Sequence, residues 1–378
     1  MPETVQQNSA RSLTQAAPTG QQQLTVGMLH LGSAVHGITR YGRMIAAELE
    51  KSPGVSVVER HHDLTAEGWR GVVAATRVPP SFSDADAVIV PYASNGLWGS
   101  QRAKLAQLVT VLAGIRAPVV TVLHDVYSPG GRRRSAWWAL ALCTALPRAV
   151  VIHGEHERSR LYRMPRAGHA RVIPHFIERR AETKRGDARR ALGVSEATRV
   201  MGVLGWIHPR KHYELAIRVL ATLEENFELW LIGSPPNGAD VYLDQLRALA
   251  QDLGVADRMT VTGYVDEDEL ALRIGALDVG LCPYRDASAS GSMATLLSAR
   301  RPIVAADFAV AADMARLAPQ TIVLVPDSDT DAYRQAVLRA AVSPPPPSAF
   351  DHLLEQLSPE AIAAQYLDTL RAVTARTP

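Results

Sequence analysis

A short run of small polar residues, Ser288-Ala289-Ser290-Gly291-Ser292, stands between an apolar run ending at Cys282 and a segment of helical composition. In an α/β protein the carboxyl end of a strand meets the amino end of a helix at such a point. Free N–H groups and the positive end of the helix dipole then face one place. Glycine and serine let an anion approach the backbone, and the serine hydroxyls add donors. The run predicts an anion site, with an ordinary serine-capped helix start as the alternative.

Two adjacent cations in another loop complement this expected site. Arg210 and Lys211 follow the apolar run 200–204 in a loop that starts at Gly205, and a helical pattern comes next. Both loops lie at strand ends of one expected sheet, so the two cations are placed to neutralise a diphosphate, with Lys211 as the preferred contact. The alternative is a solvated Arg-Lys pair at a helix start, where cations oppose the helix dipole unless an anion compensates.

Two other phosphate-binding patterns are missing from the sequence. The Gly-x-Gly-x-x-Gly fingerprint of dinucleotide binding does not follow the first strand of either half of the chain, which disfavours nicotinamide chemistry. No Gly-x-x-x-x-Gly-Lys-Ser/Thr loop occurs, which argues against a P-loop enzyme.

Composition narrows the class of protein. The chain has 378 residues, 47% of them hydrophobic, which is enough for two cores of ordinary size. Its 40 Lys+Arg against 38 Asp+Glu give a net charge of +2, without the basic excess of a nucleic-acid binder, so small molecules are the expected partners. Cys143 and Cys282 each lie in an apolar run, which predicts neither disulfides nor a cysteine zinc site. Residues 1–23 predict a disordered tail, and no run is long enough to cross a bilayer, so we expect a soluble cytoplasmic protein.

Buried-strand patterns alternate with amphipathic helical patterns, which is typical of parallel sheets covered by helices. The expected strands are 24–31, 87–90, 118–123, 149–152 and 171–177, then 200–204, 229–232, 260–262, 279–282, 303–306 and 321–325. The charged stretch 178–190 is the expected domain joint. The proline-rich stretch 343–348 predicts neither helix nor central strand, and 359–373 predicts a helix.

These patterns divide the chain into two doubly wound, Rossmann-like domains. We place the first domain at 24–178 and the second at 191–342, followed by a linker and helix at 343–378 that could pack back on the first domain. Ligands in such sheets bind at the strand ends, so a cleft between the domains is the expected site.

The order of several short motifs resembles the GT-B glycosyltransferases of family 4 type, which transfer sugars from nucleotide-sugar donors with retention. The resemblance covers most of the chain after Leu24. In the second domain it rests on the loop 205–211, on Gly263-Tyr264-Val265 with the helix after it, and on 277–304. In the first domain it rests on 37–41, on Thr-Val-Leu-His-Asp at 121–125 and on Val-Ile-Pro-His at 172–175.

The resemblance implies a GT-B fold, with parallel sheets facing across a cleft, and roles for particular residues. The expected nucleotide-sugar site comprises Gly205, Tyr264, Val265, Ser288, Ser290, Gly291, Ser292 and Thr295. The expected acceptor side comprises Gly32, Ser33, Gly37 and Asp125. His124, at a strand end, would hydrogen-bond the donor sugar or the acceptor; a histidine satisfied by the backbone is the alternative.

The sequence also departs from the family pattern. The paired glutamates of the family would fall on Ala287 and Thr295, and its loop arginine on Trp206. Thr295 can supply one hydrogen bond to a ribose, Asp286 is the candidate contact to the sugar, and Arg210 is the candidate substitute for the arginine. The departures indicate a different sugar or donor, a subclass that uses Ser-Gly in place of glutamate, or loss of catalysis. The retained Ser/Gly run favours the first two.

The resulting hypothesis is a glycosyltransferase that moves a sugar from a UDP-, GDP- or TDP-linked donor to a hydroxyl or amine of a small molecule. Lys211, Arg210 and backbone N–H groups at 290–292 would stabilise the leaving phosphate, so no metal or other cofactor is required. Bacterial natural-product or glycoconjugate synthesis is one setting that suits the Ala/Arg/Pro-rich composition. The alternatives are a GT-B sugar-nucleotide epimerase or hydrolase, and a non-catalytic nucleotide-sugar binding or partner protein.

Two further segments invite functional interpretations that we do not favour. His153-Gly154-Glu155-His156-Glu157 lacks the residue order of a zinc peptidase, so no metal site is expected there. Arg132-Arg133-Arg134 precedes Trp137-Trp138, a combination that could dock on an anionic membrane. A solvated loop leading into a buried helix is the favoured interpretation of that segment.

Overall fold

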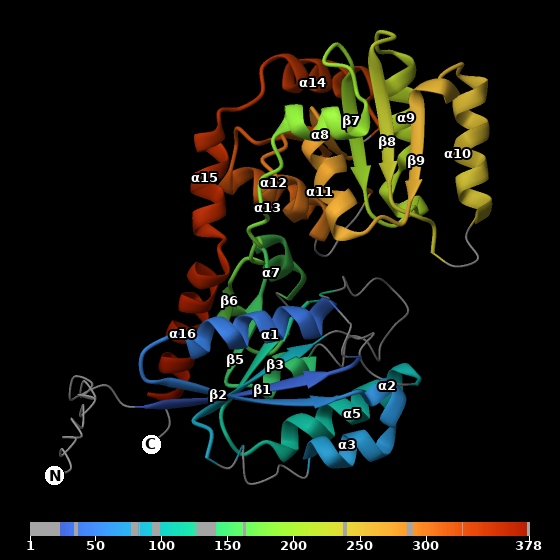
Figure 1. The fold of residues 1–378 in the computed structure, drawn as a ribbon. Helices are drawn as coiled ribbons and strands as arrows, with labels where there is room; N and C mark the ends of the chain where they lie inside the picture. The colour runs from blue at the N-terminus through green and yellow to red at the C-terminus, as the bar shows by residue number, and fades with distance from the viewer. Residues whose placement is uncertain are drawn as a thin grey trace, which may run out of the picture.

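Two six-stranded parallel sheets form the framework of the protein (Figure 1). The computed structural model describes residues 23–33, 37–76, 82, 84–92, 99–124, 126, 141–161, 164–236, 240–285, 290–326 and 328–375. The first sheet contains β1 (Leu24–Leu31), β2 (Val55–His62), β3 (Ala87–Tyr92), β4 (Val119–Leu123), β5 (Ala149–Ile152) and β6 (Ala170–Val172). The second contains β7 (Arg199–Leu204), β8 (Phe227–Ile232), β9 (Met259–Gly263), β10 (Val279–Cys282), β11 (Ile303–Ala306) and β12 (Ile322–Val325). The predicted pair of parallel sheets is confirmed.

Strand order identifies where ligands can bind. The first sheet has the order β2-β1-β3-β4-β5-β6, and the second has the order β12-β11-β10-β7-β8-β9. In each sheet the direction of chain progression reverses once, between β1 and β3 and between β7 and β10. Crevices at such reversals, beyond the carboxyl ends of the strands, are the usual ligand sites of doubly wound folds.

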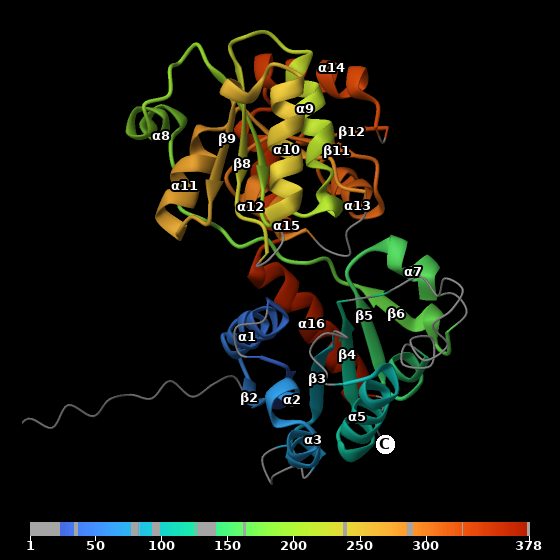
Figure 2. The same cartoon turned by 90° about the vertical axis from the view of Figure 1, so that its right-hand side faces the viewer.

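Helices cover both faces of each sheet (Figures 1 and 2). Among the described residues, those of the first half include α1 (Gly37–Glu50), α2 (Leu64–Glu67), α3 (Trp69–Thr76), α5 (Gln101–Gly114) and α7 (Glu155–Leu161). Those of the second half are α8 (Arg185–Leu192), α9 (Tyr213–Ala221), α10 (Asp240–Asp252), α11 (Glu267–Ala276), α12 (Gly291–Ser298), α13 (Ala309–Leu317), α14 (Thr330–Val342), α15 (Pro347–Gln356) and α16 (Pro359–Thr374). Short 3-10 helices form at Ala167–His169, Pro209–Lys211 and Ala256–Arg258. Because helices cover both faces, strands such as β3, β4 and β10 are buried along their whole length, which explains their unbroken apolar sequences.

The structure differs from the sequence-based prediction in three elements. β2 was not predicted, because this edge strand is only partly buried and ends in Glu59, Arg60 and two histidines. The strand expected over 171–177 is regular only in β6, and the chain from 173 to 184 has no regular structure. The prediction that 343–348 excludes helix is wrong at its end: α15 begins at Pro347, where a proline is tolerated because a first-turn N–H needs no intrahelical partner.

The last two helices connect the two halves of the molecule. In Figures 1 and 2, α15 runs beside the second sheet and α16 continues down to the first. α16 packs on α1, where the buried hydroxyls of Tyr41 and Tyr366 lie 3.0 Å apart. Arg171 also donates to the hydroxyl of Thr369 at 3.2 Å. The C-terminal helix is thus part of the first half's core. Across the described residues, no helix is both long and apolar enough to span a bilayer.

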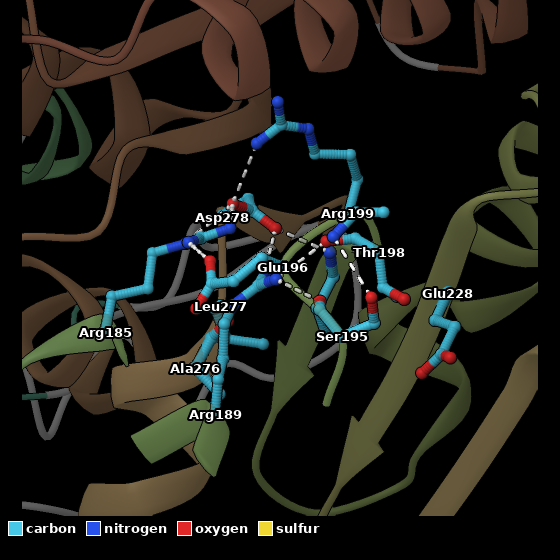
Figure 3. Close-up of polar contacts among 12 residues, drawn as sticks. Arg185, Arg189, Ser195, Glu196, Thr198, Arg199, Glu228, Ala276, Leu277 and Asp278 are labelled. Atoms are coloured by element: carbon cyan, nitrogen blue, oxygen red, sulfur yellow. Dashed lines mark hydrogen bonds and ion pairs between the residues drawn. The ribbon is translucent and has the colours of Figure 1, made fainter. Parts of the chain in front are cut away.

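A buried ion pair anchors α8 at the amino end of the second sheet (Figure 3). Arg189, whose side chain is 0% exposed, lies 2.5 Å from Asp278, the residue before β10. Its other donors reach the carbonyls of Ala276, Ser195 and Thr198 at 3.2, 2.9 and 2.8 Å. Asp278 also accepts from Arg185 and from the backbone N–H of Val200, the second residue of β7. One carboxylate therefore joins α8, β7 and β10.

This arrangement predicts very different effects for two adjacent arginines of α8. Arg189→Met should lower the free energy of unfolding by about 3 kcal/mol or more, because it leaves a buried carboxylate without its closest cation and removes the arginine donors of three carbonyls. Arg190→Met, at a side chain that is 80% exposed, should change it by less than about 0.5 kcal/mol. Urea denaturation followed by circular dichroism measures both; equal effects would contradict the structural role of Asp278.

Candidate functional site

The candidate site lies at the chain reversal between β7 and β10. The loop after β7 leads into the 3-10 helix Pro209–Lys211, and the loop after β10 leads into α12. Lys211 and Ser292, one from each loop, are in direct contact, with Nζ 3.0 Å from Oγ. The two segments that the sequence singled out as a cation loop and an anion cradle are thus brought together at the carboxyl edge of one sheet.

Lys211 is held in place by neutral groups. Its Nζ donates to the carbonyl of Leu204, the last residue of β7, at 2.5 Å, and lies 5.0 Å from the centre of the buried Tyr284 ring. Within the described ranges, no carboxylate lies at ion-pair distance from it. The thiol of Cys282 is close, but burial raises its pKa to about 12, so it is uncharged. Removal from water lowers the pKa of Lys211 to about 8.

The start of α12 fits both interpretations of the Ser/Gly run. The hydroxyl of Ser290 accepts the N–H of Met293 at 3.2 Å, so Ser290 is an N-cap. Gly291 is exposed at the first position of the helix, and a Cβ added there would meet nothing within 4 Å, so an anion could approach. Thr295 donates to the carbonyl of Gly291 at 2.8 Å, which leaves its oxygen able to accept one more bond. Asp286 and Ser288 lie outside the described residues.

Three glycines end consecutive strands beside this point. Gly205, Gly233 and Gly263 have φ values of +107°, +143° and +72°, a region that residues with a side chain rarely adopt. A Cβ on Gly205 would overlap the amine of Lys211, and one on Gly233 would overlap the backbone carbonyl of Gly205. Gly205 and Gly233 therefore let the ends of β7 and β8 and the amine of Lys211 lie close together, whereas Gly263 has open space beside it. Gly233 was missed in the sequence, although the glycines directly after the buried strands β7 and β8 were a usable signal.

The remaining candidates of the second half lie after β7 and after β9. Tyr264 follows β9 and is 83% exposed, and Val265 packs partly buried against the core. Trp206, in the loop after β7, is 61% exposed. The hydroxyl of Tyr213 donates to the carbonyls of Gly205 and Trp206 in this loop, at 3.0 and 3.3 Å. Arg210 is exposed, and its carbonyl accepts the N–H of Arg285 at 3.1 Å. Among the described residues, no hydrogen bond or ion pair joins its guanidinium to Lys211 or Ser292, so its expected phosphate contact stays a prediction.

The acceptor-side candidates lie at the ends of β1 and the start of α1. Gly32 has a φ of +122°, and its carbonyl accepts from the ring of His61 at 2.6 Å. The carbonyl of Ser33 accepts the hydroxyl of Thr39 at 2.9 Å, and Gly37 begins α1. Asp125 lies outside the described residues, as do Arg132 to Arg134 and the tryptophan pair after them.

Three histidines cluster at the opposite wall. His124 follows β4, His153 follows β5, and His175 follows β6, so the three come from adjacent strands. His124 and His153 are joined by a 3.1 Å contact between ring nitrogens. Tyr41 of α1 packs against all three rings, with centroid distances of 4.9, 5.4 and 4.5 Å to His124, His153 and His175. Burial lowers the pKa of His153 to about 3 and also lowers that of His175, so both are neutral.

A cavity of about 250 Å³ lies between this wall and α12. Its lining includes His153 and His175 on one side and Ser290 and Gly291 on another. α13 contributes both apolar residues and the charged side chains of Asp313 and Arg316. His124 contacts His153 but does not line the cavity. His156 lies in the segment 153–157, for which the sequence predicted no metal site. Its ring nitrogen lies 2.7 Å from the carboxylate of Asp313 in α13, so this contact joins the two halves of the molecule.

Comparisons with known proteins agree with this geometry. Residues 198–342 match the family described as "Glycosyl transferases group 1". The chain is similar to a D-inositol 3-phosphate glycosyltransferase of Mycolicibacterium gilvum, 28% identical over 42% of this chain and 36% of that protein. It is also similar to the 2-deoxystreptamine glucosyltransferase of Streptomyces kanamyceticus, 29% identical over 28% of this chain and 27% of that protein. The matches thus span about a third of these relatives.

Solved structures extend the likeness to nearly the whole chain. Sucrose-phosphate synthase from Thermosynechococcus elongatus superposes with a TM-score of 0.73 at 16% identity, over 94% of this chain and all of that one. Anabaena HepE, solved with UDP-glucose, gives 0.70 at 15% identity, over 92% of this chain and all of that one. The protein therefore has the GT-B fold of two Rossmann-like domains. The resemblance to family 4 glycosyltransferases is confirmed by the fold and by the group 1 domain at 198–342.

The low pKa of Lys211 predicts how its removal changes stability. A lysine with a pKa of about 8 when folded and about 10.4 when unfolded destabilises the folded state while it is charged, and that penalty disappears as pH rises from about 8 to 10. Lys211→Met should therefore not lower the free energy of unfolding at pH 7.5, and should lack the stabilisation that the wild type gains by pH 9.5. Urea unfolding at both pH values tests this.

Lys51→Met is the matched control for that experiment, because the Lys51 side chain is 66% exposed. This variant should keep the wild-type gain in stability between the two pH values. A Lys211→Met protein that is clearly destabilised at pH 7.5, with a wild-type pH response, would mean that Lys211 serves the fold.

Proposed function

We propose that the protein is a glycosyltransferase that moves a sugar from a nucleoside diphosphate donor to a hydroxyl or amine of a small acceptor, with retention at the anomeric carbon. The observation that carries the proposal is the desolvated amine of Lys211 beside the amino terminus of α12, with no carboxylate partner among the described residues. A cation and a helix terminus that face the same point both favour an anion there.

The diphosphate binds between Lys211 and the first N–H groups of α12, those of Gly291 and Ser292. Negative charge grows on the leaving phosphate as the glycosidic bond breaks, and these fixed donors stabilise that charge without reorganisation. Because the positive groups come from the protein, the chemistry needs no metal. The departing phosphate oxygen then takes the acceptor proton on the same face of the sugar, which accounts for retention without an enzymatic nucleophile.

The base and the sugar extend from the phosphates in opposite directions. Tyr264 and Val265, after β9, receive the base, and the exposed Tyr264 ring offers a stacking surface. The sugar enters the cavity between α12 and the histidine wall. Support for a nucleotide-sugar donor comes from HepE, which was solved with UDP-glucose and shares the fold. The proposal includes a cytoplasmic location and a role in natural-product or glycoconjugate synthesis.

The missing family glutamates motivate a second candidate, a non-catalytic protein that binds nucleotide sugars. Thr295 uses its hydroxyl proton on the Gly291 carbonyl, so it offers a ribose one acceptor position where a carboxylate would offer two oxygens. The two candidates share the binding site and differ in turnover. An assay of nucleoside diphosphate release, with acceptors that include inositol phosphates and aminocyclitols, separates them, since two relatives are named for such acceptors.

Nucleotide binding is the first test. Calorimetric titration with UDP, GDP, TDP, ADP and CDP, with and without Mg²⁺, should give metal-independent binding of one nucleotide. Lys211→Met should weaken it about 10- to 100-fold, because a charge-assisted hydrogen bond contributes about 1.5–3 kcal/mol. Lys51→Met should bind like the wild type. If no nucleotide binds a folded sample, or if Lys211→Met binds unchanged, the proposal is overturned.

The pH dependence of binding gives an independent check. Only the protonated amine attracts a diphosphate, and its pKa in the ligand-free protein is about 8. A bound anion raises that pKa, so affinity should fall as pH increases from 8 to 9.5, and binding at pH 8.5 should take up protons. Titrations in buffers of different ionisation enthalpy measure the uptake. The Lys211→Met variant should show neither effect; a wild-type affinity that is flat over this range would contradict the role of Lys211.

A further inference from the structure

A contact between α7 of the first half and α13 of the second forms part of the cavity wall. The carboxylate of Asp313 in α13 accepts the backbone N–H of His156 at 3.4 Å, and the same oxygen lies 2.7 Å from Nδ1 of the His156 ring. The two side chains are only 11% and 16% exposed, for His156 and Asp313. Both residues line the cavity, so this link between the halves lies at the cavity itself.

Gly154 is the residue that lets α7 and α13 lie so close together. A Cβ added to Gly154 would overlap an oxygen of the Asp313 carboxylate and would lie 2.5 Å from Nδ1 of His156. The φ of Gly154 is not in the left-handed region that favours glycine. The close approach of the two halves, and not an unusual backbone conformation, is therefore what requires glycine at this position.

Hydrogen bonds fix the first-half side of this contact to the first sheet. The buried carboxylate of Glu157 accepts the backbone N–H groups of His153 and Gly154 at 2.7 and 3.3 Å. Nδ1 of His153 lies 3.0 Å from the carbonyl oxygen of Ile173, the residue after β6. His153 lines the cavity and directly precedes Gly154, so a displacement of Gly154 would also displace this part of the histidine wall.

The second-half side is fixed to the sheet that carries the diphosphate site. α13 follows β11, and β11 pairs with β10, the strand that leads to α12. Asp313 also pairs with Arg316, which belongs to α13 itself and so adds nothing to the link between the halves. α16 joins the halves as well, but it packs on α1, and none of the described residues that line the cavity belongs to either helix. The contact between α7 and α13 therefore bears directly on the distance from α12 to the histidine wall.

We propose that Gly154 and Asp313 are positioning residues that set the separation of α7 and α13, and with it the width of the cavity that receives the donor sugar. The proposal rests on the proposed function of the cleft. The diphosphate contacts, Lys211 and the start of α12, lie in the second half alone, so they do not depend on this separation. The sugar touches both walls, and a misplacement of about 1 Å can lower a rate about 100-fold.

Two glycine substitutions in the full-length protein test the separation. Gly154→Ala adds one methyl group between α7 and α13. Gly168→Ala is the matched control, because Gly168 lies in the 3-10 helix beside α7 and a Cβ there would meet nothing within 4 Å. Calorimetric titration uses UDP and UDP-glucose, or the corresponding pair for the nucleotide that the panel selects. Both variants should bind the diphosphate within about 2-fold of the wild type. Gly154→Ala alone should bind the nucleotide sugar about 10-fold more weakly and lose about 10-fold or more in kcat.

Substitutions of Asp313 test the other side of the contact. Asp313→Asn keeps an oxygen that accepts from His156 and should bind both ligands like the wild type. Asp313→Leu has a similar size but no acceptor, so it should lose affinity for the nucleotide sugar and keep its affinity for the diphosphate. Hydrogen exchange over residues 154–161 should be faster in Asp313→Leu than in Asp313→Asn, because the N–H of His156 has lost its acceptor.

The outcomes separate this proposal from the proposed function. A folded Gly154→Ala protein that binds the nucleotide sugar as well as Gly168→Ala overturns the positioning role, and so does an Asp313→Leu protein with unchanged exchange over 154–161. If Gly154→Ala does not fold, the two Asp313 variants decide. Exchange that responds to Asp313→Leu in a protein that binds no nucleotide would support the contact between the halves and reject both the sugar cavity and the sugar-transfer function.

Discussion

A lysine that has no carboxylate partner among the described residues organises the second half of this protein. A buried cation, Arg189, and a partly buried one, Lys211, lie at opposite ends of the same sheet. Arg189, at the amino ends of the strands, meets the carboxylate of Asp278, and its charge is used within the fold. Lys211, at the carboxyl ends, meets a carbonyl, a hydroxyl and an aromatic ring, and burial lowers its pKa to about 8. An amine desolvated in this way destabilises the free protein, and a ligand with negative charge removes the penalty. Arg189 thus stabilises the sheet through an ion pair, whereas the charge of Lys211 favours the binding of an anion.

The local backbone holds the amine of Lys211 in place. Gly205 adopts a φ of +107°, which brings its Cα so close to Lys211 that no side chain would fit. The buried hydroxyl of Tyr213 fastens the loop by bonding the carbonyls of Gly205 and Trp206. Ser292 links the amine to the first turn of α12, so the lysine and the helix terminus share one fixed position. Such preorganisation suits an enzyme, because the electrostatic stabilisation of a leaving group then needs no rearrangement.

Local sequence patterns predicted most strands and the loop that contains Lys211. The contacts between residues far apart in the sequence depend on the three-dimensional arrangement of the strands. Unbroken apolar runs located β3, β4 and β10, and a serine before a helical pattern located the start of α12. The edge strand β2 was not predicted, because its apolar and polar residues do not alternate regularly and are only partly buried. That Lys211 touches Ser292, 81 residues away, follows only from strand order. The histidine wall could not be predicted from local pattern, since His124, His153 and His175 become neighbours only through adjacent strands. Tyr41, from a helix far earlier in the chain, packs against all three rings, and burial lowers the pKa of His153 and of His175.

The two walls of the cleft differ in electrical character, and the difference matches the two parts of a nucleotide sugar. The second domain presents a cation and a helix amino terminus, which suit the diphosphate. The first domain presents imidazoles that burial keeps neutral, as the lowered pKa values of His153 and His175 show. Charged histidines there would add to the positive charge of Lys211 and would repel the oxocarbenium-like sugar that forms when the donor breaks. Neutral rings with lone pairs bind hydroxyl groups without opposing that charge. Burial of the histidines is therefore as much a requirement of the proposed chemistry as burial of the lysine.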